Sequence, residues 1–157
     1  MEWSQIAPYF EPDGSLLDIY ILETSLVDWA KVWAYLLASP HSLEFSINGE
    51  LTPAPLDVGE AFRLRPDRSA FAVYALGKQR LNCHFFTEVE VEFSLDPCDV
   101  DGPSEAYRLV QFLTELGRAT LKEVRLTAEN VPHAVIARYE PTKGQVVWIP
   151  AKTWPYA

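Results

Sequence analysis

The sequence predicts a single α+β domain over residues 1–157, with a mostly antiparallel sheet of six or seven strands and two main helices on one face of that sheet. Three observations lead to this prediction. The length is close to the commonest size of one domain. The run from Leu81 to Leu95 alternates apolar and polar residues, as a half-buried strand does. Two stretches, 26–39 and 104–120, repeat apolar residues at helical spacing.

The first strand and the first helix follow from the residues after the N-terminal segment. Residues 16–22, LLDIYIL, are apolar on both faces apart from Asp18 and Tyr20, which is typical of an interior strand. Thr24 or Ser25 can cap the helix that follows, because a side-chain oxygen at this position accepts from the free backbone amides of the first turn. We expect the apolar stripe of this helix to pack on the sheet.

The next elements are separated by turn signals. A strand over residues 43–47 ends at Asn48-Gly49, the best hairpin signal in the chain. The proline-rich region that follows predicts a loop with a short helix around 59–64. Residues 70–76, AFAVYAL, then form an apolar strand that leads into the central run.

The central run has apolar residues at every odd position from Leu81 to Leu95 except Thr87, and polar residues at every even position except Phe86. Fifteen residues exceed the usual length of one strand, so the run predicts either a bent strand or a hairpin. The alternation keeps its parity across the middle, which disfavours a two-residue loop. A three-residue loop centred on Thr87 would set His84 opposite Glu90.

The C-terminal part predicts a helix that begins after Ser104 and three strands, over 124–128, 134–139 and 145–149. Both predicted helices are preceded by a strand and followed by a strand that ends near an asparagine. This order suggests a possible pseudo-repeat of a strand-helix-strand unit.

The acidic residues are unevenly distributed. The net charge is −9, and residues 1–60 contain ten carboxylates against one basic residue, Lys31. Residues 61–157 contain twelve of each sign. Such a field repels nucleic acid and anionic lipid and attracts a basic partner, although an acidic surface also serves solubility alone. Together with the lack of a long apolar run or a signal-peptide pattern, these features predict a cytoplasmic protein with no nucleic-acid or membrane partner.

The common catalytic motifs are absent. No glycine pattern for dinucleotides or phosphates occurs, and no metal signature is complete, since the calcium-like loop from Asp99 lacks its glycine. Cys83 and His84 would point to opposite faces of a strand and so could not act as a nucleophile-base pair. The sequence therefore predicts no cofactor, no metal and no catalytic residue, and it favours a non-enzymatic role, whereas an enzyme stays open.

A candidate partner-binding surface follows from the polar side of the central run and the acidic segment after it. A row of glutamates with less polar anchors inside an acidic rim suits a docking surface for a basic protein. The competing interpretation is that basic residues between positions 63 and 80 neutralise this row within the chain. The eight candidate residues are His84, Phe86, Glu88, Glu90, Glu92, Asp96, Asp99 and Asp101.

Three functions remain open on this basis. The leading hypothesis is a protein-binding module of the immunity or inhibitor type, by analogy of size, charge and fold with such proteins. The first alternative is a small enzyme or small-ligand binder that uses His84 with Glu90 or Glu92. The second is a structural subunit of a homo-oligomer, paired through a sheet edge or through aromatic residues near the termini, which are Trp3, Tyr9, Phe10, Trp148, Trp154 and Tyr156.

Overall fold

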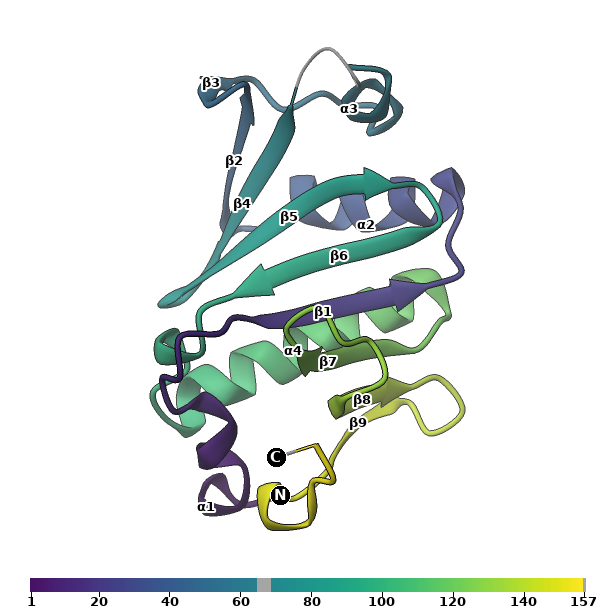
Figure 1. Cartoon of the computed structure of the whole chain (residues 1–157). Helices are drawn as coiled ribbons and strands as arrows, with labels where there is room; N and C mark the ends of the chain where they lie inside the picture. The colour runs from purple at the N-terminus through teal and green to yellow at the C-terminus, as the bar shows by residue number, and fades with distance from the viewer. Residues whose placement is uncertain (65–68, 157) are drawn as a thin grey trace.

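The computed structural model describes residues 1–64 and 69–156, and it is a single-sheet α+β fold (Figure 1). Its helices are α1 (Trp3–Ile6), α2 (Leu26–Ala38), α3 (Gly59–Arg63) and α4 (Pro103–Thr120), with 3₁₀ turns η1 (Ala7–Phe10), η2 (Pro97–Asp99) and η3 (Ala151–Thr153). Its strands are β1 (Leu17–Leu22), β2 (Ser42–Ile47), β3 (Glu50–Thr52), β4 (Ala70–Leu76), β5 (Gln79–Thr87), β6 (Glu90–Leu95), β7 (Val124–Ala128), β8 (Val135–Glu140) and β9 (Gln145–Trp148). No helix of the described residues is long and apolar enough to cross a bilayer.

The nine strands form one sheet in the order β3-β2-β4-β5-β6-β1-β7-β8-β9, and every neighbouring pair is antiparallel. Helix α2 carries the chain from β1 to β2, and α4 carries it from β6 to β7. In each case the two strands run in the same direction and are not neighbours, so a long crossover is needed. Figure 1 shows the two helices on the same side of the sheet, as the sequence predicts.

The core lies between the helices and the sheet. The odd-numbered residues of β5 and β6 face it, and Phe93, for example, meets Phe112 of α4 edge to face at 5.3 Å between ring centroids. Trp29 of α2 stacks on Phe85 at 5.4 Å. Of the two predicted caps of α2, Ser25 takes this place within a capping box, because Ser25 and Asp28 each accept from the other's backbone amide.

The predicted number of strands, six or seven, is too low. Two features account for the difference. Residues 81–95 fold back on themselves and contribute both β5 and β6. Strand β3 has only three residues, too few to display an alternation that a sequence pattern could reveal.

The predicted register of the central hairpin is wrong. A two-residue loop, Glu88 and Val89, joins β5 to β6, and Thr87 pairs with Glu90. A β-bulge between His84 and Thr87 then shifts the register, so that His84 lies opposite Glu92 instead of Glu90. The extra residue of the bulge restores the parity that a two-residue loop would otherwise break, and the sequence pattern is therefore the same for both arrangements.

Candidate functional site

The sheet face that points away from the helices carries a block of polar side chains on three neighbouring strands. In β1 and β6, Asp18 pairs with Ser94 and Tyr20 with Glu92, while His84 of β5 lies on the other side of Glu92. We call these five residues the polar block. Four of them are buried on this face, opposite the one on which α2 and α4 pack: Asp18, Tyr20, Glu92 and Ser94 are 3%, 3%, 8% and 4% exposed.

The loop between β7 and β8 helps to cover the polar block, and Figure 1 shows it arching across the sheet beside β1. The backbone amide of Asn130 in this loop donates to Asp18 Oδ2 at 2.6 Å, and the Tyr20 hydroxyl donates to the same oxygen at 3.0 Å. Burial raises the pKa of Asp18 even though both hydrogen bonds act to lower it. Burial also raises the pKa of Glu92; the hydroxyl of Tyr20 acts to lower it, and the charges of Asp18 and Glu90 act to raise it.

His84 is held by Ser94 instead of by a carboxylate. Its Nε2 lies 2.9 Å from Ser94 Oγ, and its ring stacks on Phe86 at 4.9 Å. Desolvation lowers the pKa of His84, with the charge of Asp18 opposing the effect. The residue opposite His84 is Glu92 and not the expected Glu90, and the pKa of His84 is not raised. The acid-base site formed by His84 with Glu90 or Glu92 stays a prediction.

The exposed members of the eight candidate binding residues divide into two groups. Phe86 and Glu88 are exposed at the hairpin end of β6, whereas Asp96 and Asp101 are exposed beyond its other end, around η2. Six residues of β6 separate the groups, which corresponds to about 20 Å of extended chain. Glu90, Asp99 and His84 are half-buried, and Glu92 is buried. Their role in binding a partner stays a prediction.

The basic residues between positions 63 and 80 do not neutralise the glutamate row among the described residues. Lys78 Nζ pairs with Asp101 at 2.8 Å, Arg80 lies 3.9 Å from Glu44, and Arg63 pairs with Asp57. Two further arginines of that set, at positions 65 and 68, lie outside the described residues. The described basic residues of this set therefore pair with carboxylates outside the glutamate row.

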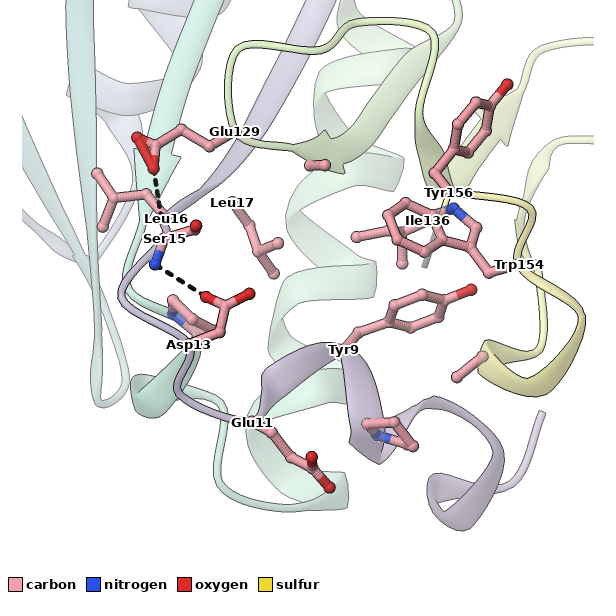
Figure 2. A pocket seen from close by; sticks show the side chains of 14 residues that line it. Tyr9, Glu11, Asp13, Ser15, Leu16, Leu17, Glu129, Ile136, Trp154 and Tyr156 are labelled. Carbon is pink, nitrogen blue, oxygen red and sulfur yellow. Dashed lines mark hydrogen bonds between the residues drawn. The ribbon is translucent and has the colours of Figure 1, made fainter.

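A pocket of about 400 Å³ lies between the N-terminal segment, the start of β1 and the C-terminal tail (Figure 2). Three carboxylates line it: Glu11, Asp13 and Glu129. Two of them are fixed by backbone amides, since Asp13 Oδ1 accepts from Ser15 N and Glu129 Oε1 accepts from Leu16 N, both at 2.8 Å. No lysine or arginine is among the fourteen residues that line the pocket. We call it the terminal pocket.

Aromatic rings form another part of the wall of the terminal pocket. Figure 2 shows Tyr9, Trp154 and Tyr156 across the pocket from Asp13 and Glu129. The Tyr9 hydroxyl donates to Ile149 O at 2.6 Å, and the Trp154 indole donates to Val135 O at 2.9 Å. Tyr9 and Trp154 meet edge to face at 5.5 Å. Burial raises the pKa of Tyr9 to about 12, so this ring is an uncharged phenol at neutral pH.

The sequence did not predict this pocket, although it pointed to some of its residues. The aromatic residues near the termini were recognised as a possible patch, and Glu11 and Asp13 as part of the acidic N-terminal region. Glu129 and the polar block residues Asp18 and Tyr20 were not identified as site residues. The only signal for the last two is that they are the polar exceptions in an otherwise apolar strand, which marks burial with a partner.

Metal and thiol chemistry find little support in residues 1–64 and 69–156. No group of three or more histidine, cysteine or acidic side chains in these ranges is arranged to hold a metal ion. Cys83 is buried, which raises the pKa of its thiol and keeps it protonated. Cys98 is exposed and also unpaired among these residues, and hydrogen bonding to Asp96 raises the pKa of its thiol.

Comparison with known proteins gives no relative: no family model matches this chain, and neither the curated proteins nor the solved structures contain a significant match.

Replacing Glu92 by glutamine is expected to stabilise the protein at pH 8 by roughly 1 kcal/mol, the scale of one buried polar contact. The pKa of Glu92 is raised in the folded state, so its favourable contribution is complete below the ordinary glutamate pKa and is lost as the pH rises through the folded value. Glutamine removes this loss because it carries no charge. Urea unfolding at pH 8 and at pH 4 should therefore show the gain only at pH 8. Glu88→Gln, at the exposed hairpin tip, is the matched control, and an equal gain at both pH values would contradict the burial argument.

Proposed function

We propose that this protein is a non-enzymatic protein-binding module, of the immunity or inhibitor type, that binds a basic partner through its acidic surface. The observation that supports this most is the terminal pocket, where three carboxylates and three aromatic rings meet without a lysine or arginine in the lining. Acidic side chains that keep their charge uncompensated at a concave site attract cationic groups. Aromatic rings at such a site supply the large contact area on which residues at the centre of protein interfaces usually rely.

The charge distribution supports the same function. Ten of the carboxylates lie in residues 1–60, and the pocket takes Glu11 and Asp13 from that region. Asp96, one of the predicted binding residues, directly precedes Pro97, which also lines the pocket. A basic protein approaching this side would be steered by the summed field, and its association rate would fall steeply with salt.

Reversing two pocket charges, Glu11→Lys with Asp13→Lys, is expected to reduce binding of a basic partner by at least about tenfold, mainly through the association rate. The measurement is a pull-down from native lysate with tagged protein at low and moderate salt, followed by kinetics with the purified partner. The matched control is Glu50→Lys with Glu60→Lys, which makes the same change in net charge on other exposed residues, in β3 and α3.

Comparing the two double variants distinguishes binding at the terminal pocket from a general effect of net charge on binding. Loss of a stoichiometric basic partner from the pocket variant, with retention by the control, supports the proposal. Equal loss from both variants would mean that net charge alone governs binding. No stoichiometric basic partner at either salt concentration would overturn the proposed function.

A further inference from the structure

We propose that the terminal pocket receives an arginine side chain of the partner. This proposal rests on the proposed function and names the chemical group that the pocket selects. The pocket combines two kinds of wall. Carboxylates of Asp13 and Glu129 lie on one side, and the rings of Tyr9 and Trp154 lie on another (Figure 2). A guanidinium group is the cation that uses both, because it is planar, stacks on aromatic faces and donates in a fork to carboxylate oxygens.

The carboxylates are held in place before any ligand arrives. Each of Asp13 and Glu129 gives one oxygen to a backbone amide, on the consecutive residues Ser15 and Leu16. The second oxygen of each has no hydrogen bond to the described residues. A ligand can therefore bond these oxygens without first ordering two flexible side chains, which would otherwise cost binding free energy.

The aromatic wall is fixed in the same way. The polar atoms of Tyr9 and Trp154 are occupied by the carbonyls of Ile149 and Val135, at 2.6 and 2.9 Å. Their interplanar angle of 88° places the two rings nearly perpendicular. Since these polar atoms are already used, the rings offer a ligand their apolar surfaces and their π faces, and not further hydrogen bonds.

The two walls together distinguish among cations. A lysine ammonium is compact and strongly hydrated, and it gains less from a flat ring than a guanidinium does. A quaternary ammonium ion binds aromatic faces but has no N–H to give to Asp13 or Glu129. The cavity of about 400 Å³ lies within the range of small-ligand sites and exceeds a single guanidinium head, so the methylene stem can enter too.

The test uses the full chain with three small probes at constant ionic strength: argininamide, lysinamide and tetramethylammonium. Nuclear magnetic resonance follows the indole N–H of Trp154, identified by comparison with Trp154→Phe. We expect argininamide to bind about three times more tightly than lysinamide or better, and tetramethylammonium to bind more weakly than both. Equal affinities for argininamide and lysinamide, or no change at the Trp154 indole, would overturn the arginine assignment.

Two conservative variants test the carboxylates. Asp13→Asn and Glu129→Gln keep the oxygen that accepts from Ser15 N or Leu16 N and remove only the charge. Each should weaken argininamide about tenfold, because a charge-assisted hydrogen bond becomes a neutral one. Glu50→Gln in β3 is the control and should leave the affinity unchanged. Unchanged affinity in both pocket variants would contradict the proposal.

The test of the arginine assignment and the test of the proposed function can fail independently. If a basic partner is captured and lost on charge reversal while argininamide and lysinamide bind equally, the binding module stands and the arginine assignment fails. If argininamide binds selectively at the Trp154 wall while no basic partner is captured, the pocket chemistry stands and the protein-binding function fails.

Discussion

Phe85→Ala is expected to lower the free energy of unfolding by about 4 kcal/mol, because it empties the centre of an aromatic cluster. The ring of Phe85 is 5% exposed and lies against four other aromatic rings among the described residues. Its centroid is 5.4 Å from Trp29, 5.7 Å from Trp33, 5.8 Å from Phe62 and 6.1 Å from Phe45. These rings come from α2, α3 and β2, so this one side chain ties three elements to β5.

The neighbouring residue provides the control. Phe86 has the same side chain on the opposite face of β5 and is 57% exposed, so Phe86→Ala should cost under about 1 kcal/mol. Thermal unfolding should show a fall in Tm of about 10 °C for the Phe85 variant and little change for the Phe86 variant. Similar losses in the two variants would show that the two faces are not divided as described.

Gly117→Ala is expected to destabilise the protein by about 2 kcal/mol, although alanine usually stabilises a helix. Alanine would gain about 1 kcal/mol from helix propensity. An added Cβ at this position would, however, overlap the ring of Tyr139 in β8, with Cγ of that ring at 2.7 Å. Overpacking of this kind costs about 3 kcal/mol, because α4 or the buried tyrosine must move.

A double-mutant cycle with Tyr139→Leu tests the cause. With the ring removed, Gly117→Ala should become neutral or stabilising, and the coupling between the two positions should reach about 2 kcal/mol. The measurement is urea unfolding of the four proteins of the cycle. Independent effects of the two substitutions would mean that the close approach of α4 to β8 is not the reason for glycine at this position.

The predictions that depended on local pattern were largely confirmed. The alternation in residues 81–95 placed most of its apolar positions on the core face, and Leu81, Phe93 and Leu95 are fully buried there, whereas Val89 in the hairpin loop is 63% exposed. The helical stripe predicted in residues 26–39 placed Trp29, Trp33 and Leu36 on the buried face of α2, as the structure has them. Three other apolar residues of that stripe, Leu26, Ala30 and Leu37, are exposed instead. Patterns of this kind succeed because each residue's direction follows from the backbone geometry of its own element.

The predictions that depended on neighbours in space were less successful. The polar side of β6 was expected to be a surface, but Glu92 and Ser94 are buried beside Asp18 and Tyr20. The alternation of apolar and polar residues in β6 is the same whether its polar side faces solvent or is buried. The sequence pattern cannot show that β1 brings two more polar side chains to the same place, or that the amide of Asn130 closes over them.

The sequence by itself determined the α+β class, the two main helices, the face of each element that is apolar, and the concentration of acidic charge in the N-terminal region. Only the tertiary structure decided the hairpin register, the polar block and the terminal pocket. In that pocket Tyr9 bonds Ile149, 140 residues away along the chain, and Leu16 bonds Glu129, 113 residues away. The reason is physical: periodicity and turn chemistry act over a few residues, whereas the meeting of remote segments depends on the summed packing of all elements.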